Sequence, residues 1–459
     1  MYLAIDIGTS SCKGVLSTEC SYWIEQIGLQ VTRSGLAVEQ DPSDWLAALR
    51  LIVPRLLQRA KRPATEIKGI SVSSHSPSLV PVDENGIALR PCLTWQDRRA
   101  QSQARRLSEL VGEHLDPSHF EAKILWTKEN EPEIYSKTKA FLQPKDFVIF
   151  HLTGDFAIDR AAALLIRIQS GSQIDLQKVP PAVPNWEIVN VTSERASEFG
   201  LVPGVPVVAG GIDAYCEALG AGLVEDGQFG DVTGTSTCLS YCLNESDHKA
   251  GAVPHVIPER SLYILPLSLS GGALTWFLNN LGQNLSFDQI GSVVAQSPPG
   301  ARGLIFLPYL EGERSPIWDD KAKGLFFGIT ASHTQADFLR AVLEGSAFAV
   351  RHNLELLAER ISSPREVRAT GGGARLESWN QIKADVTGLT YQQLDIAEGA
   401  LVGGIILAMH AVEKRPISDL VSELVGVKKA FTPQPGVEVY EESFQRYKQL
   451  YSCTRELMR

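Results

Sequence analysis

Apolar and polar positions near the start of the chain alternate between strand-like and helix-like patterns. The run YLAIDI, residues 2–7, is bounded by the turn residues GTSS and predicts a buried strand. The pair Asp41-Pro42 predicts a helix start, because aspartate is a preferred N-cap and proline fits the first helical position. The pair Asn85-Gly86 between apolar runs predicts a hairpin. Further strand patterns lie at 23–31 and 67–72.

The middle of the chain predicts two polar helices, a loop region and a strand that ends in an acid. The helices are expected at 97–113 and at 132–153, the second interrupted near Pro144, and loops at 170–205. The run PVVAGGI, residues 206–212, predicts a buried strand, and Asp213 follows it at the start of small residues with helical spacing.

The second half repeats the alternation of strands and helices. Residues 231–243 predict a strand, a turn and a second strand. We expect helices at 273–281, near 335–360, from 377, at 398–413 and at 439–459, and strands at 366–370 and 390–394, with the turn Gly371-Gly372-Gly373 between them.

The two halves open in a similar way. Each has an aspartate on a strand followed by a Gly-Thr-Ser turn, at Asp6 with Gly8-Thr9-Ser10 and at Asp231 with Gly234-Thr235-Ser236. This predicts a duplicated α/β unit whose two lobes face a central cleft. We expect domains at 1–224 and 225–459, with the last helix a candidate to pack back on the first domain.

Composition and charge narrow the classes of partner. The chain has 459 residues, enough for two or three domains, and its 44% hydrophobic and 21% charged residues are typical of globular proteins. A net charge of -10 disfavours nucleic-acid or membrane surfaces, since both require a basic footprint. Seven cysteines without a CxxC pair indicate reduced thiols, and no signal-peptide or membrane-spanning pattern is present, so we expect a cytoplasmic protein.

Three turns are candidates for holding phosphate. A Gly-Thr-Ser turn after a strand presents backbone N–H groups and hydroxyls in one concave surface, although a single such turn is a common hairpin. Two of them, and the Gly371-Gly372-Gly373 turn between a strand and a helix, favour a nucleotide site. The sequence has no GxxxxGK[ST], GxGxxG, HExxH or GxSxG motif. Nucleotide binding would therefore follow the actin-like pattern, with two turns gripping phosphates and acids positioning Mg²⁺.

The segment around Asp213 leaves two interpretations open. An aspartate at a helix start is often only a cap that accepts bonds from free backbone N–H groups. Alternatively, Gly210 and Gly211 clear space for a ligand on which the acid acts.

These motifs together resemble the FGGY family of carbohydrate kinases, and most of all its xylulokinase branch. The similarity extends over essentially the whole chain, in the family's order. The matching segments are AIDIGTSSCKG (4–14), LTWQDRRA (93–100), PVVAGGIDAYCEALGAG (206–222), DVTGTSTCL (231–239), LPYLEGERSPIWDDKAKGLFFGIT (307–330) and ATGGGARLESWNQIKADVTGL (369–389).

The resemblance implies two ribonuclease H-like (actin-like ATPase) domains and ATP-dependent phosphorylation of a small sugar. It implies that Asp213 is the general base and contacts the sugar, and that Asp6 lies at the Mg²⁺ ion. The ATP-binding residues that it implies are Gly8, Thr9, Ser10, Lys13, Gly234, Thr235, Ser236, Gly271, Thr275, Gly372, Gly373 and Glu377. For Thr275, a plain helix start is the alternative.

For the sugar-binding site, the resemblance implies that Ser74, His75, Trp95 and Asp97 contact the substrate. His75 could instead be a satisfied core histidine, Trp95 could pack in the core, and Asp97 could form a structural ion pair with Arg99. No macromolecular partner is expected, and a homodimer is left open.

The chain also departs from the xylulokinase pattern. Where that branch has Gln-Met-His-Gly, this sequence has Ser-Ser-His75-Ser, and the segments 110–125 and 160–200 look shorter. Kinase chemistry is therefore expected without a named sugar, which could be a ketose, a polyol or a sugar acid. The competing hypotheses are a catalytically silent sugar or nucleotide sensor and a chaperone-like ATPase. Asp6, Asp213 and the two Gly-Thr-Ser turns argue against the sensor hypothesis. The W-x-D-x-R and GGID motifs argue against the chaperone-like ATPase hypothesis.

Overall fold

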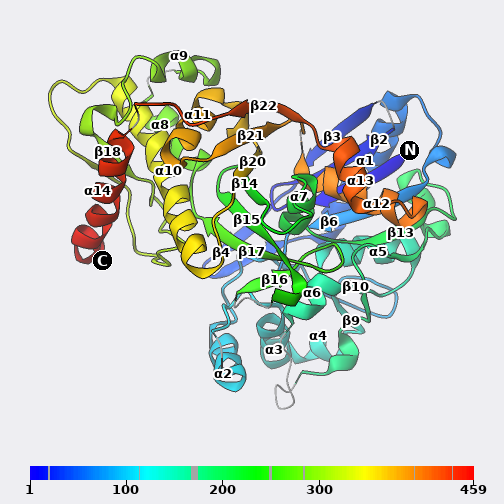
Figure 1. Ribbon diagram of the computed structural model, residues 1–459. Coiled ribbons are helices and arrows are strands. Elements are labelled where there is room, and N and C mark those ends of the chain that lie inside the picture. The colour runs from blue at the N-terminus through cyan, green and yellow to red at the C-terminus, as the bar shows by residue number, and fades with distance from the viewer. Residues whose placement is uncertain are drawn as a thin grey trace. The chain divides into compact units, whose positions relative to one another are not determined.

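A computed structural model describes residues 1–18, 21–112, 114–166, 174–247, 251–282, 285–396, 398–436 and 438–459. The chain divides into two compact units, each made of three chain segments. The first unit comprises residues 1–220, 253–258 and 398–424, and the second comprises 221–252, 259–397 and 425–459. Figure 1 labels most of their helices and strands.

The first unit is built on a six-stranded mixed sheet. The central strand β1 pairs antiparallel with β2 and parallel with β6, and β13 continues the parallel part beyond β6. The strand order is β12 (Ile188–Val191), β13 (Pro206–Ile212), β6 (Gly69–Ser74), β1 (Tyr2–Ile7), β2 (Ser11–Ser17) and β3 (Tyr22–Gly28).

Helices cover both faces of this sheet. Ile5 lies beside Ile52 of α1 (Pro42–Ala60), on the face that α5 (Pro144–Thr153) also covers. The alternate residue Ala4 faces α12 (Gly399–Glu413), which packs against α7 (Asp213–Gly220). Since successive side chains on a strand point to opposite faces, Asp6 lies on the α12 side of the sheet.

Glycines allow α12 to approach its neighbours closely. A Cβ atom at Gly403 would lie 2.0 Å from the carbonyl oxygen of Cys216 on α7, and one at Gly404 would lie 3.0 Å from the Ala4 Cβ. The apolar, glycine-rich run at 399–412 is therefore a buried helix of the first unit. Among the described residues, none of the helices has the length and apolar character that crossing a bilayer requires.

Additional helices and short sheets complete the first unit. Asp41 caps α1 and Pro42 is its first residue, which confirms the predicted helix start. The remaining elements are α2 (Gln101–Val111), α3 (Phe120–Asn130), α4 (Pro132–Lys137), α6 (Arg160–Leu165), α13 (Ile417–Leu424) and the sheets β4 (Thr32–Ser34)–β5 (Ala37–Gln40)–β8 (Cys92–Leu93), β7 (Val80–Val82)–β9 (Ala140–Leu142) and β10 (Ile158–Asp159)–β11 (Ala182–Val183).

The predicted helix 132–153 is wrong in its middle. Residues 140–142 form strand β9, which pairs with β7, and they separate α4 from α5. A short apolar run fits a helix and a strand equally well by periodicity, and pairing with β7 decides the outcome. Helix α3 lies between the two predicted helices and shows no amphipathic pattern because it buries Glu121, Lys123 and Thr127.

The second unit repeats the strand order of the first. β14 pairs antiparallel with β15 and parallel with β20, as β1 does with β2 and β6. The order is β16 (Ala252–Pro254), β17 (Arg260–Leu267), β15 (Thr237–Asn244), β14 (Phe229–Thr233), β20 (Glu366–Thr370), β21 (Thr390–Leu394) and β22 (Val427–Phe431). Two ribonuclease H-like sheets thus confirm the predicted fold class.

In the described part of the second unit, five α-helices and a short hairpin accompany the sheet. They are α8 (Gly271–Asn280), α9 (Ile290–Val294), α10 (Gln335–Arg360), α11 (Glu377–Thr387), α14 (Val439–Thr454) and β18 (Ile305–Leu307)–β19 (Leu325–Phe327). We expected the last helix to pack back on the first domain, but α14 packs within the second unit. Its Tyr440, Phe444 and Tyr447 are buried in the core of that unit, and the segment that returns to the first unit is 398–424.

A bulge in β13 explains the glycine pair before Asp213. Between Val208 and Gly211, β13 has one more residue than its partner β6. Gly210 has φ of +63°, and a Cβ there would lie 1.9 Å from the Val72 carbonyl oxygen. A Cβ at Gly211 would lie 2.5 Å from the Val256 side chain. The glycines therefore permit a bulge that is packed against protein on both sides, and they do not clear space for a ligand there.

We predict that Gly210→Ala destabilises the first unit by about 2–4 kcal/mol, because alanine adds a backbone clash to the cost of a left-handed conformation. Gly204→Ala is the matched control, since Gly204 also has positive φ, +90°, but has open space around the added Cβ. It should cost only about 1 kcal/mol. Urea denaturation monitored by circular dichroism measures both, and equal losses would contradict the packing argument.

Candidate active site

Three parallel strands of the first unit end at the same edge of the sheet and place polar residues there. Asp6 lies near the end of β1, His75 follows β6, and Asp213 follows β13. In open α/β sheets, ligands bind at the carboxyl ends of the strands. This edge is therefore the candidate site of the first unit.

Four carboxylates and one lysine gather on the α12 side of that edge. The Asp6 Oδ1 atom accepts a hydrogen bond of 2.7 Å from the Ser73 hydroxyl. Lys13, which is paired with Asp6 across β1 and β2, forms a 2.7 Å ion pair with Glu398 at the start of α12. Glu217 lies one turn after Asp213 on α7, so their side chains share one face of the helix.

Burial and mutual repulsion make these acids harder to ionise. Burial raises the pKa of Asp213 well above its usual range, and the negative charge of Asp6 raises it further. Burial also raises the pKa of Asp6, against the opposing effects of the Ser73 hydrogen bond and the Lys13 charge. The pKa of Glu217 rises to about 7 through burial and the charges of Asp6 and Glu398. Strongly perturbed acids at a sheet edge are typical of functional sites.

The geometry at Asp213 differs from that of a helix cap. A capping aspartate precedes the helix and accepts a bond from the N–H group two or three residues later. Asp213 is itself the first residue of α7, and its Oδ1 atom accepts a 2.7 Å bond from the N–H group of the next residue, Ala214. The structure therefore favours a role other than capping.

His75 is buried and bonded on both ring nitrogens. It is 2% exposed, and its Nε2 and Nδ1 atoms lie 2.8 Å from Gln40 Oε1 and 2.7 Å from the Ser78 hydroxyl. Burial lowers its pKa to about 3, so the ring is neutral. These contacts match the alternative of a satisfied core histidine. A sugar contact by His75 stays a prediction that requires one of these bonds to be exchanged.

A chain of hydrogen bonds links this histidine to the Gly8-Thr9-Ser10 turn. The Gln40 amide donates a 2.5 Å bond to the Thr9 carbonyl oxygen while its own oxygen faces His75. The indole N–H of Trp95 donates a 2.9 Å bond to the Thr9 hydroxyl. Trp95 directly, and His75 through Gln40, therefore also contact the Gly8-Thr9-Ser10 turn.

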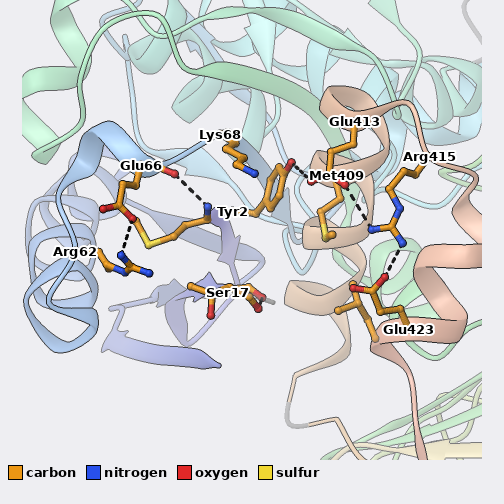
Figure 2. A pocket seen from close by; sticks show the side chains of 12 residues that line it. Tyr2, Ser17, Arg62, Glu66, Lys68, Met409, Glu413, Arg415 and Glu423 are labelled. Atoms are coloured by element: carbon orange, nitrogen blue, oxygen red, sulfur yellow. Dashed lines mark hydrogen bonds and ion pairs between the residues drawn. The ribbon is translucent and has the colours of Figure 1, made fainter. Parts of the chain in front are cut away.

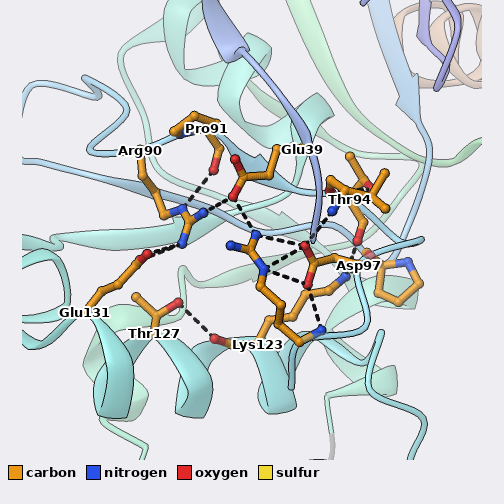
Figure 3. Close-up of polar contacts among 11 residues, drawn as sticks. Glu39, Arg90, Pro91, Thr94, Asp97, Lys123, Thr127 and Glu131 are labelled. Carbon is orange, nitrogen blue, oxygen red and sulfur yellow. Dashed lines mark hydrogen bonds and ion pairs between the residues drawn. The ribbon is translucent and has the colours of Figure 1, made fainter. Parts of the chain in front are cut away.

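Ser74 and Asp97 are buried and engaged with protein. The Ser74 hydroxyl accepts a 3.2 Å bond from the Lys145 N–H group. Asp97 is 1% exposed and accepts bonds from the Val38 N–H group and the Arg99 guanidinium, so it forms the structural ion pair that we named as its alternative role. Figure 3 shows Asp97 in a network with Glu39, Arg90 and Glu131.

The predicted nucleotide segments of the second unit converge on one turn. The N–H groups of Ser270, Gly271 and Gly272 at the start of α8 donate to the carbonyl oxygens of Gly234 and Thr235. A Cβ at Gly371 or Gly373 would lie 2.6 Å or 2.3 Å from Thr233. The exposed Gly-Thr-Ser turn, the α8 N-terminus and the triple glycine thus form one surface.

The two remaining nucleotide candidates of this unit are exposed. Thr275 lies on the exposed side of α8, and Glu377 opens α11 and forms a 2.6 Å ion pair with Lys429. Neither side chain is held in place by core residues, and the nucleotide contact of each stays a prediction.

The two strand aspartates are not equivalent. Asp6 lies two residues before Gly8, whereas Asp231 lies three residues before Gly234. Because side chains alternate between the faces of a sheet, this offset places Asp231 on the opposite side relative to its turn. Asp231 is fully buried and forms a 2.7 Å ion pair with Lys383 of α11, so it is a core residue of the second unit.

Sequence reasoning missed Gln40, Glu217 and Glu398. The spacing Asp213-x-x-x-Glu217 was an available signal, because it places two acids on one helix face. Glu398 is the first residue of a helix that we had predicted, but its pairing with Lys13 requires a fold that joins residues 385 positions apart. Gln40 has no signal in a single sequence.

A cavity of about 600 Å³ lies at the other end of β1. Tyr2, Lys68, Glu413 and Arg415 are among its lining residues (Figure 2). The Tyr2 hydroxyl donates a hydrogen bond to Glu413, and Arg415 forms an ion pair with Glu423. Polar side chains in the walls of this cavity therefore bond to one another. Since it adjoins the start of β1, it is separate from the carboxyl edge of the sheet.

Comparisons with known proteins match both units to one family. The models of the FGGY family of carbohydrate kinases match residues 1–220 for the N-terminal domain and 232–412 for the C-terminal domain. A xylulose kinase from Staphylococcus epidermidis is 32% identical, covering 99% of this chain and 97% of the relative. A gluconokinase from Bacillus subtilis is 28% identical, covering 98% and 93%. The crystal structure of xylulose kinase from Rhodospirillum rubrum covers 99% of both chains at 26% identity, with a TM-score of 0.88.

We predict that Glu217→Gln stabilises the ligand-free protein at pH 8 but not at pH 4. The folded-state pKa of about 7 exceeds the ordinary value of 4.5, so wild-type Glu217 binds its proton more tightly when folded and costs stability as the pH rises from 4.5 to 7. The thermal midpoint at pH 8 should rise by about 2–5 °C. Differential scanning calorimetry in a metal chelator measures this, with Glu109→Gln on the exposed surface as the control.

Proposed function

Since the chain belongs to the FGGY family of carbohydrate kinases, we propose that it transfers the γ-phosphoryl group of ATP to a small sugar. The acceptor is a ketose such as xylulose or ribulose, or a related polyol or sugar acid. The observation that carries this proposal is the position of Asp213. It lies near Asp6 at the carboxyl edge of the first sheet, the edge at which the Gly8-Thr9-Ser10 turn follows β1, and it has a raised pKa and no capping bond.

In the proposed reaction Asp213 accepts the proton of the attacking sugar hydroxyl. The hydroxyl oxygen forms a bond to the γ-phosphorus, the bond from that phosphorus to the β–γ bridging oxygen breaks, and ADP leaves. A carboxylate with a raised pKa is a stronger base than one of ordinary pKa, which suits this role. Phosphoryl transfer otherwise requires in-line positioning and charge neutralisation.

The backbone turns support ATP as the donor. The turn Gly8-Thr9-Ser10 in the first unit and Gly234-Thr235-Ser236 in the second present N–H groups and hydroxyls suited to phosphate oxygens. In the second unit, the bare backbone of Gly372 leaves room for a flat ring, because a Cβ there would meet no atom within 4 Å.

The acids also fit a magnesium ion. Asp6 has one carboxylate oxygen bonded to Ser73, and no hydrogen bond to the other is found in the described part of the chain. Within that part, no group of three or more His, Cys, Asp or Glu side chains could hold a metal by itself. Mg²⁺ usually keeps several waters and takes one or two carboxylates plus substrate phosphates, so Asp6 would hold it directly or through water. The ion would neutralise phosphate charge during transfer.

An ADP-release assay across ketoses, alditols and aldonates tests the proposal and identifies the acceptor. Relatives named for xylulose and for gluconate are both similar to this chain, so both substrate classes belong in the screen. ADP release that depends on one of these compounds supports the proposal. Binding of sugar or ATP with no turnover for any of them would favour a silent sensor.

We predict that Asp213→Asn lowers kcat by about 10²–10⁴-fold while ATP affinity changes less than about twofold, since the amide cannot accept the proton. Asp226→Asn, on an exposed turn of the second unit, is the control and should leave kcat unchanged. Steady-state kinetics and ATP titration by calorimetry measure both. A variant that keeps more than about a third of wild-type turnover would refute the assignment of the base.

We predict that Asp6→Ala raises the Mg²⁺ concentration for half-maximal rate by at least about tenfold and lowers kcat, with little change in sugar affinity. Ser73→Ala removes the hydrogen bond to Asp6, together with a longer 3.4 Å contact to the Ile5 carbonyl oxygen, but keeps the carboxylate, so it should shift the Mg²⁺ dependence in the same direction by less. Rates measured over a Mg²⁺ titration test this. Unchanged metal dependence in Asp6→Ala would contradict the placement of the ion.

A further inference from the structure

A buried asparagine contacts the bulge that leads to the proposed base. Asn185 is fully buried, and its Nδ2 atom donates a 2.7 Å hydrogen bond to the Gly210 carbonyl oxygen. A Cβ built on Gly211 would lie 3.1 Å from the same nitrogen. The amide therefore lies directly against Gly210 and Gly211, which are three and two residues before Asp213.

The neighbours of this amide fix its orientation. Its nitrogen faces two acceptors, the Gly210 carbonyl oxygen and Asp159 Oδ1, the latter also at 2.7 Å. Its oxygen accepts a 3.0 Å bond from the Ala161 N–H group. A flipped amide would place an acceptor against two acceptors, so one orientation satisfies the site.

The hydrogen bond from Asn185 to Gly210 gives the bulge a fixed contact that the sheet ladder does not supply. A β-bulge leaves its extra residue out of the regular ladder and re-aims the side chains that follow. Glycines are also the residues with the most backbone freedom, so a Gly-Gly bulge does not fix its own torsions. Asn185 supplies a side-chain donor to the carbonyl group within the irregular segment.

A buried ion pair anchors the asparagine in turn. Asp159 is fully buried and forms a 2.9 Å ion pair with Lys145 at the start of α5. The Lys145 N–H group donates to the Ser74 hydroxyl at the end of β6, the strand beside the bulge. The network thus begins and ends on neighbouring strands, β6 and β13, at the edge where Asp213 lies.

We propose that Asn185, held by Asp159, is a positioning residue that sets the location of Asp213 through the Gly210 carbonyl group. This inference rests on the proposed role of Asp213 as the base. Asn185 is fully buried, and in this proposal it acts on the rate only by fixing the bulge. Misplacing a catalytic group by about 1 Å can cost about 10²-fold in rate.

The first test compares Asn185→Ala with a control whose hydrogen bond lies at the other end of β13. Asn185→Ala should lower kcat by about 10–100-fold with the KM values for sugar and ATP within about threefold. The control is Thr192→Val, because the buried Thr192 hydroxyl accepts a 2.9 Å bond from the Val205 N–H group at the opposite end of β13. It should lower the thermal midpoint without changing kcat per folded molecule. If Asn185→Ala does not fold, Asn185→Ser replaces it, since one hydroxyl donor serves only one of the two acceptors.

A double-mutant cycle separates positioning from general stability. If Asn185 acts through the base, Asn185→Ala in the Asp213→Asn background should change kcat less than about twofold, although it lowers kcat strongly in the wild type. Equal fold losses in both backgrounds would overturn the inference, as would an unchanged kcat in the single variant. A fully active Asp213→Asn would instead refute the proposed base, so the two failures are distinguishable.

Discussion

Side chains on a β-strand alternate between the faces of its sheet, and the chemistry of this protein depends on that constraint. On β1, alternation sends Ile5 into the core beneath α1 and Asp6 to the side of α12 and Lys13. On β14, a one-residue offset from the turn sends Asp231 into the core instead. On β13, one extra residue changes the alternation just before Asp213. Single-residue differences in register thus decide which acids are available for chemistry.

The acids of the protein core and the acids of the candidate site also differ in their charge partners. Asp231 and Asp159 are fully buried; Asp231 pairs with the buried Lys383, and Asp159 shares the buried Lys145 with Asp146. Such pairs hold structure, since a buried charge without a partner is strongly destabilising. Among the described residues no lysine forms an ion pair with Asp213 or Glu217, and both acids have raised pKa values. Crowding these acids costs stability. We therefore expect a cation from outside the protein and a proton donor to bind at this edge of the first sheet.

Sequence alone predicted the features that local chemistry controls. The Asp41-Pro42 helix start, the Gly-Thr-Ser turns and most strands and helices follow from capping, turn and periodicity rules, and the structure confirms them. It did not predict β9, whose strand form depends on pairing with β7. Nor could it show that both nitrogens of His75 are already bonded, or that Gly210 and Gly211 serve packing. Each of these depends on residues distant in sequence, which spacing does not reveal.

The return of residues 398–424 to the first unit has a consequence for how the chain is made. Glu398, the partner of Lys13, and α12, which covers Ala4 and packs on α7, come from near the end of the chain. At a ribosomal rate of about 5–20 residues per second, the first 220 residues wait roughly 10–40 s for this segment. During that interval the sheet face beneath α12 lacks the helix that covers it. A nascent chain is therefore most vulnerable to aggregation and chaperone capture while its second unit is being synthesised.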